Sequence, residues 1–276
     1  MPVLPSQPPS DSAPSAQTAV DKALVLLKSL AELDGKIGVT DLARRTRLTK
    51  STTFRLLGIL QRHDLVERVG SDYRLSARLF DIGARVYGST PLVLHERLMP
   101  YLADLYEMTH ETVHLAVLHG TDIVYVNKLQ GHRAIRSPSR IGARLPAHCT
   151  GVGKALLAFD HDAAEATITA GLTARTVHTC TDPEQLRTEL RRIRQEGIAY
   201  DRQEALPGLS CVAVPVMGSA GRPVAALSVA GCTRRIDAAR LAPALRRAAY
   251  EAGRAMSAAS VARHPASASL NGLPAA

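Results

Sequence analysis

Apolar and polar positions between residues 39 and 62 repeat with the period of a helix and separate onto two faces. The pattern predicts a helix over 40–46 and a second over 50–62, joined by a tight turn, with Thr40 and Thr49 as N-caps. In the second helix one face is apolar, with Thr53, Leu56, Leu57 and Leu60. The opposite face carries Ser51, Arg55, Gly58 and Arg62. A helix of this kind can dock on a core and lie in the major groove of DNA.

Two short β-prone runs follow, over 65–69 and 73–75, around a turn at Gly70–Asp72. They predict a hairpin, and three helices followed by a hairpin are typical of a winged helix-turn-helix, which we place over residues 17–77. A solvated basic face on an ordinary helix pair is the alternative that the helix pattern alone leaves open.

Positive charge is concentrated in the same segment. Residues 36–78 contain ten Lys and Arg against four acids, which is +6 of the formal charge of +9 for the whole chain. We therefore expect phosphate contacts and base contacts from this module. The expected phosphate contacts are Arg44, Arg45, Lys50, Arg68 and Arg74, and the expected base contacts are Ser51, Thr52 and Arg55.

The flanking segments differ in composition. Residues 1–16 are rich in Pro and Ser and are expected to be a disordered leader, as are residues 260–276 at the other end. Residues 78–90 are predicted to form a linker helix, whose apolar stripe pairs either with its twin in a dimer or with the second domain of its own chain. A longer helix is predicted over 91–109, bent or split by Pro100.

Beyond residue 110 the period changes to that of strands. Hairpins are predicted over 112–118 with 123–129, and over 211–217 with 223–230, and helices over 151–159, 183–196 and 237–258. Strand pairs interleaved with helices predict an α+β domain with an antiparallel sheet over residues 91–259.

Composition and motifs exclude several classes of protein. The chain has no apolar run long enough to cross a membrane, no export signal and no CxxC pair among its four cysteines, so we expect a cytoplasmic protein with reduced thiols. His110–His114 spells H-E-x-x-H but is predicted to run from a helix end into a strand, where the zinc geometry is lost. Gly153–Lys154 lacks the rest of a phosphate-binding loop. We find no catalytic constellation, no cofactor motif and no metal motif, although His114, His148 and Cys211 could meet around a metal.

Five segments together resemble the IclR family of bacterial transcriptional regulators. They are VDKALVLLKSLAEL (20–33), LTKSTTFRLLGIL (48–60), LPAHCTGVGKALLAF (145–159), GIAYDRQEALPGLSCVAVPV (197–216) and GRPVAALSVAG (221–231). The resemblance implies a winged helix-turn-helix, a linker helix and a GAF-like domain that binds a small organic acid or aromatic effector. It also implies dimers or tetramers on palindromic operators.

Carried over by position, the resemblance implies an effector pocket of Gly151, Val152, Asp201, Cys211 and Ser228. A second serine common in the family is replaced here by Ala230. Independently, the glycines at 151 and 153 open a helix whose free amides favour an anion. Three alternatives remain: the glycines serve only close packing, Asp201 forms a surface pair with Arg202, and Cys211 is a small core residue.

The sequence therefore predicts a ligand-responsive transcriptional regulator with double-stranded operator DNA, a small effector and a second copy of itself as partners. Two other classes stay open. One is a small-molecule-processing enzyme with a basic appendage, and the other is a constitutive DNA-binding protein that responds to no effector.

Overall fold

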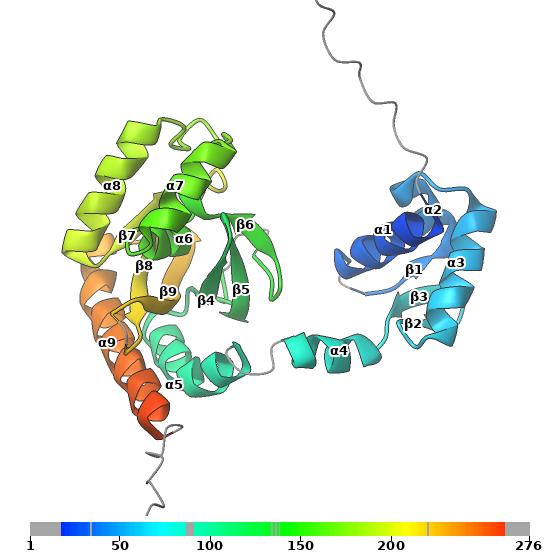
Figure 1. Cartoon of the computed structure of the whole chain (residues 1–276), viewed down its shortest axis with the longest axis horizontal. Helices are drawn as coiled ribbons and strands as arrows, with labels where there is room; N and C mark the ends of the chain where they lie inside the picture. The colour runs from blue at the N-terminus through cyan, green and yellow to red at the C-terminus, as the bar shows by residue number, and fades with distance from the viewer. Residues whose placement is uncertain are drawn as a thin grey trace, which may run out of the picture. The chain divides into compact units, whose positions relative to one another are not determined.

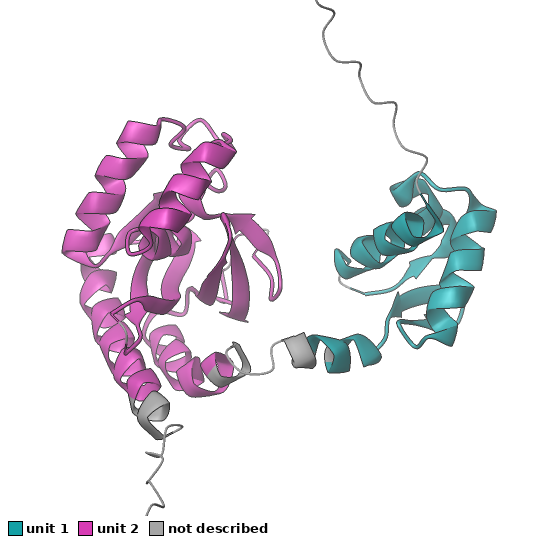
Figure 2. Cartoon of the chain, viewed as in Figure 1, with its two compact units in different colours: residues 1–88 teal, residues 89–276 magenta. Residues whose placement is uncertain are grey.

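The protein is described by a computed structural model, which covers residues 18–33, 35–86, 91–133, 135, 137, 139–219 and 221–262. The chain divides into two compact units, residues 1–88 and 89–276 (Figure 2). The predicted leader and most of the predicted tail lie outside the described residues.

The first unit is a helical bundle with a small antiparallel sheet of order β1-β3-β2 (Figure 1). Its core comes from the apolar stripes of the helices and from the inward side chains of the hairpin, Val66 and Tyr73. This arrangement confirms the predicted winged helix-turn-helix. Its elements are α1 (Ala19–Ala31), β1 (Ile37–Gly38), α2 (Val39–Thr46), α3 (Lys50–Arg62), β2 (Val66–Val69), β3 (Asp72–Leu75) and α4 (Arg78–Val86).

The two predicted helix caps have different outcomes. Thr49 caps α3, because its hydroxyl accepts from the Thr52 amide at 3.2 Å. The prediction for Thr40 is wrong: α2 already begins at Val39, its N-cap is Gly38, and no side chain bonds the free amides there. Gly38 pairs with Asp72 in the sheet, so the strand leads directly into the helix.

The second unit is built on a six-stranded antiparallel sheet of order β6-β5-β4-β9-β8-β7. Both predicted hairpins are present, and the two strands β4 and β9 join them side by side at the centre. The elements are α5 (Pro91–Thr109), β4 (Thr112–His119), β5 (Asp122–Leu129), β6 (Arg144–Pro146), η1 (Ala147–Cys149), α6 (Gly151–Leu157), α7 (His161–Ala170), α8 (Pro183–Glu196), β7 (Ala199–Arg202), β8 (Leu209–Met217), β9 (Pro223–Cys232) and α9 (Ala238–Ala262).

Helices cover both faces of this curled sheet (Figure 1). One apolar cluster joins α5 and α9 to the sheet, with Leu98 and Leu245 fully buried. A second cluster joins α6, α7 and α8 to the other face. The central strands are therefore buried on both sides, which explains why residues 211–217 and 223–230 are almost wholly apolar.

The differences from the predicted elements are local. Pro100 lies inside α5 without splitting it. Short β6 and β7 and the alanine-rich α7 were not predicted, and α9 runs to Ala262, beyond the predicted end at 258. Among the described residues, no helix combines the length and the apolarity required to span a bilayer.

Candidate functional site

The α3 helix presents two different faces, as its sequence pattern predicts. Thr53, Leu56, Leu57 and Leu60 are buried against the core of the first unit. Ser51 and Arg55 are exposed on the other side, and Thr52 is half-buried beside them. The structure thus leaves the predicted base-contacting side chains accessible to a groove.

The cations predicted to contact phosphate are exposed but differ in their partners. Arg44 pairs with Asp41 at 3.1 Å, Arg45 with Glu32 at 3.0 Å, and Arg74 with Glu67 across the wing. Arg68 lies over the Tyr73 ring and donates to the Gly70 carbonyl at 2.9 Å. Within the described residues, Lys50 and Arg55 form no ion pair or hydrogen bond through their side chains. These two groups need not release a partner to bind DNA.

Three further exposed side chains of the helix-turn-helix were not among the predicted contacts. Arg47, in a left-handed conformation between α2 and α3, and Arg62, at the end of α3, are exposed and form no side-chain ion pair in the described part of the chain. Phe54 on α3 is 57% exposed although it is aromatic. An exposed aromatic ring on such a helix can contact a thymine methyl group.

The five residues predicted for the effector pocket lie around one cavity in the second unit. Gly151 and Val152 come from the start of α6, Asp201 from β7, Cys211 from β8 and Ser228 from β9. Ala230 also lines the cavity, so the replacement of the family's second serine removes one hydroxyl from the cavity wall. The cavity has a volume of only ≈ 20 Å³, which is room for about one water molecule.

Polar side chains that the sequence did not assign to the pocket complete its wall. The buried His114 ring contacts the Ser139 hydroxyl through Nε2 at 2.9 Å and the Ser228 hydroxyl through Nδ1 at 3.4 Å. The ring of Tyr125 lies 4.9 Å from that of His114. Burial, with a smaller effect of Lys128, lowers the pKa of His114 to about 3, so the imidazole is neutral. The pairing of β4 with β9 places His114 opposite Ser228.

The glycines at the start of α6 are required by close packing. A Cβ on Gly151 would lie 2.6 Å from the Cys211 sulfur, and one on Gly153 would lie 2.2 Å from the Ala147 carbonyl oxygen. The Thr150 hydroxyl already accepts from the Gly153 amide at 3.1 Å. Close packing therefore requires glycine at both positions.

Asp201 is buried, and the surface-pair alternative is wrong. Its side chain is 2% exposed, whereas Arg202 is exposed and stacks over the Tyr200 ring. The carboxylate accepts from the Glu204 amide at 2.7 Å and from the Ala205 amide at 3.4 Å. Burial raises the pKa of Asp201 to about 7, helped by the nearby Glu204 carboxylate. Asp201 thus changes its protonation state near neutral pH.

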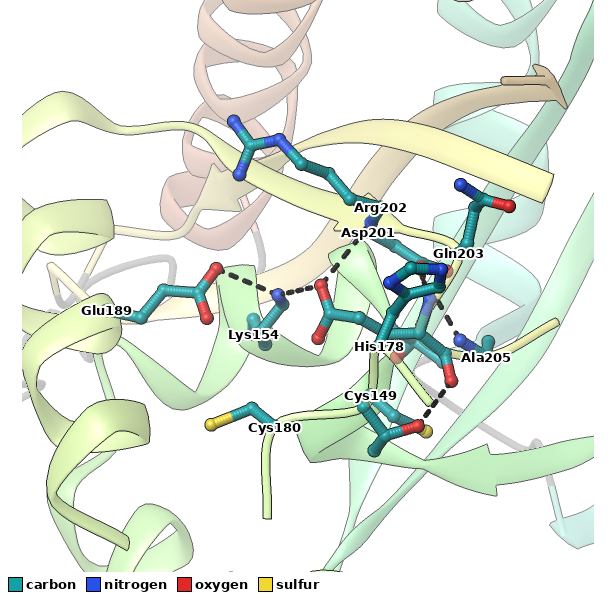
Figure 3. A network of polar contacts seen from close by, with 12 residues as sticks. Cys149, Lys154, His178, Cys180, Glu189, Asp201, Arg202, Gln203 and Ala205 are labelled. Atoms are coloured by element: carbon teal, nitrogen blue, oxygen red, sulfur yellow. Dashed lines mark hydrogen bonds and ion pairs between the residues drawn. The ribbon is translucent and has the colours of Figure 1, made fainter. Parts of the chain in front are cut away.

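A buried ammonium lies behind the pocket. Lys154 is fully buried and donates to Glu204 at 2.6 Å and to Glu189 at 2.8 Å; the contact between Lys154 and Glu189 is drawn in Figure 3. Burial alone would lower the pKa of Lys154, but the two carboxylates raise it above its ordinary value. The lysine that follows Gly153 is therefore an internal cation and not part of a phosphate-binding loop.

The remaining motifs carry no site in the described residues. His110 has a positive φ of 52° between the end of α5 and the start of β4, so H-E-x-x-H does not lie on one helix. No group of three or more His, Cys, Asp or Glu in the described residues is placed to hold a metal, so His114, His148 and Cys211 do not form one. All four cysteines are free and three are buried, including Cys211.

Family models match both units of the chain. The model described as the bacterial transcriptional regulator IclR C-terminal domain matches residues 90–258, and the IclR helix-turn-helix domain matches residues 19–70. The HTH-type transcriptional regulator XynR of Escherichia coli is 36% identical and covers 87% of this chain and 95% of its own length. The Transcriptional repressor IclR of Escherichia coli is 32% identical, over 79% of this chain and 81% of the relative.

Solved structures agree with these matches. The Thermotoga maritima IclR structure has a TM-score of 0.72 at 28% identity, covering 86% of this chain and 98% of the other. An IclR homolog from Microbacterium hydrocarbonoxydans, complexed with 4-hydroxybenzoate, has a TM-score of 0.74 at 25% identity, covering 87% and 99%. With a helix-turn-helix unit, a C-terminal α+β unit and matches over both, the chain belongs to the IclR family of DNA-binding bacterial transcriptional regulators.

Proposed function

We propose that this regulator binds a palindromic operator as a dimer or tetramer and that a small organic acid in the pocket modulates this binding. The observation that carries the DNA part is the exposed polar face of α3, where Ser51 and Arg55 stand opposite a buried apolar face. The twofold symmetry of a dimer would place two such helices about one DNA turn apart. Phosphate contacts would come from Arg44, Arg45, Lys50, Arg68 and Arg74, and base contacts from Ser51, Thr52 and Arg55.

The effector part rests on the buried polar cavity of the second unit. Gly151, Val152, Asp201, Cys211 and Ser228 would bind the effector, whose carboxylate would lie near the start of α6. That a homolog was solved with 4-hydroxybenzoate supports an acid of this size. No set of side chains among the described residues indicates catalysis, and we propose a regulator rather than an enzyme. As a DNA-binding regulator it would act in the cytoplasm.

The small volume of the cavity suggests how binding would regulate. A cavity of ≈ 20 Å³ has no room for an organic acid, so the effector would bind a form of the domain in which the pocket is wider. A ligand that binds one form better shifts the population toward it. In a dimer this shift would change the separation of the two DNA-binding units, with residues 17–77 as the DNA-binding domain, 78–90 as the linker and 91–259 as the effector domain.

The test is a gel-shift assay with the promoter beside the protein's own gene, at about 150 mM salt and with excess competitor DNA. We expect binding to one site that resists the competitor and that changes when a member of a panel of small acids is added. Substrate turnover without site preference would support the enzyme alternative. Site-specific binding that no acid alters would leave a constitutive DNA-binding protein.

A further inference from the structure

The effector pocket contains a carboxylate but no cationic side chain to balance it. Its described lining includes Asp201 and the neutral His114, with hydroxyl, thiol and apolar groups, and no Lys or Arg. An organic anion bound in this pocket, in its wider form, would share a buried, low-dielectric site with the Asp201 carboxylate. Two carboxylates in such contact cannot both stay ionised without a large repulsion.

The groups that surround Asp201 do not supply the missing positive charge. Lys154 is the ammonium near it, but Lys154 already lies between the Glu204 and Glu189 carboxylates at 2.6 and 2.8 Å. Lys154 forms no ion pair with Asp201 within the described residues, and the second oxygen of Glu204, Oε2, has no hydrogen-bond partner there.

Lys128, next to the pocket, donates to the Ser139 carbonyl at 2.6 Å and is not part of the lining, and the titratable groups described next are neutral. Burial raises the pKa of the Cys149 thiol, and also of the Cys211 thiol and the Tyr125 phenol, so these groups keep their protons at neutral pH. Burial keeps His114 unprotonated. Asp201 is therefore the pocket group that can accept a proton as an anion enters.

We propose that the pocket takes up an organic carboxylate together with one proton, which Asp201 carries, so that the effector binds more weakly as the pH rises above neutrality. The proton comes from solvent and converts the Asp201 carboxylate to a carboxylic acid. Its O–H then donates to the effector carboxylate, while the Glu204 and Ala205 amides continue to donate to the other Asp201 oxygen. This inference rests on the proposed carboxylate effector.

The raised pKa of Asp201, about 7, sets the range of the effect. If the anion binds only the protonated form, its affinity is set by the protonated fraction, which falls about tenfold between pH 6 and pH 8. The number of protons taken up on binding rises from near zero at pH 6 to about one at pH 8. A permanently ionised Asp201 that only accepts from an effector hydroxyl would take up none.

Isothermal titration calorimetry of the full chain with benzoate and 4-hydroxybenzoate measures this uptake, in pairs of buffers that differ in ionisation enthalpy. We expect about one proton at pH 8 for the wild type. Asp201→Asn keeps the two amide hydrogen bonds and mimics the protonated acid, so it should bind with no uptake and no dependence on pH. Asp182→Asn, which removes a carboxylate from the N-cap of α8, is the matched control and should retain the uptake.

The outcomes separate this inference from the proposed function. Binding of either acid without proton uptake at pH 8 overturns the inference and leaves the regulator intact. If neither acid binds, the proposed effector class fails. The protonation of Asp201 is then tested by urea unfolding of the protein without effector. In that case the urea midpoint of the wild type should fall relative to that of Asp201→Asn between pH 5 and pH 8, because the folded state holds a proton that the unfolded state has lost. Parallel midpoints would overturn the protonation of Asp201 itself.

Discussion

The polar face of α3 and the proposed effector pocket differ in how their polar groups are exposed to water. On α3 the charged groups of this face, Lys50 and Arg55, are exposed to water and unpaired within the described residues. In the pocket the groups are buried and neutral, apart from the titrating Asp201. The first surface is expected to respond to salt and hardly to pH, and the second to pH and hardly to salt.

The difference shows that burial, and not residue type, decides what a charge does in this protein. Arg44 and Asp41 form an exposed pair at 3.1 Å, which water and salt screen. Lys154 and Glu204 form a pair at 2.6 Å in which the ammonium is 0% exposed. We therefore expect the loss of an ion pair to cost little stability on the surface of the first unit and much more in the interior of the second.

The largest expected effect is on the buried side of this comparison. Lys154→Met leaves Glu204 buried without its cation and should lower the free energy of unfolding of the second unit by about 3–5 kcal/mol. Urea unfolding followed by far-UV circular dichroism measures the loss. Arg44→Met is the matched surface control, and we expect no measurable change. Equal effects of the two substitutions would remove the distinction between the two units.

A smaller effect is expected on the DNA-binding face. Arg55→Ala should weaken binding to the operator by about 1–3 kcal/mol if Arg55 contacts a guanine with two hydrogen bonds, and should relax specificity at that base pair. Fluorescence anisotropy with the operator and with base-substituted operators, at fixed salt, measures both quantities.

Arg247→Ala is the matched control for this experiment, since Arg247 is an exposed arginine on α9 that pairs with Glu251 at 3.1 Å. It should leave the operator affinity unchanged. If the Arg55→Ala protein keeps the base preference of the wild type, Arg55 does not contact a base in a sequence-specific way. Phe54 would then be the next residue on α3 to test.

The smallest expected effect tests the start of the DNA-binding helix. Thr49→Ala removes the hydroxyl that caps α3 and should lower the free energy of unfolding of the first unit by about 1 kcal/mol. Thr40→Ala should change it by less, because Thr40 lies inside α2 and caps nothing. Thermal unfolding of both variants gives the comparison, and a greater loss for Thr40→Ala would contradict the observed caps.

Much of the fold could be predicted from local pattern. Helices α5 and α8 have the predicted bounds, because Pro91 and Pro183 mark their starts and apolar residues repeat at helical spacing. The two long hairpins followed from β-rich runs around short turns. Strands β6 and β7 are only three and four residues long, and each is separated from the strand it pairs with by a loop longer than a tight turn, so no local hairpin pattern marks them.

The site was predictable only in part. The five pocket residues came from a resemblance spread over three segments, and the structure brings all five to one cavity. Tyr125 and Ser139 were missed, and His114 was considered only as a possible metal ligand. The role of Lys154 was also missed, because its partners Glu189 and Glu204 are 35 and 50 residues away along the chain.

By itself the sequence determined the helical and strand periods, the basic surplus of residues 36–78 and the two faces of α3, because these properties depend on neighbours along the chain. Only the tertiary structure decided which polar groups are removed from water. It placed Asp201 in a closed cavity and Lys154 between two carboxylates, while leaving Arg55 in solvent. Burial arises from contacts between distant segments, and it is burial that determines whether a charge is held, screened or neutralised.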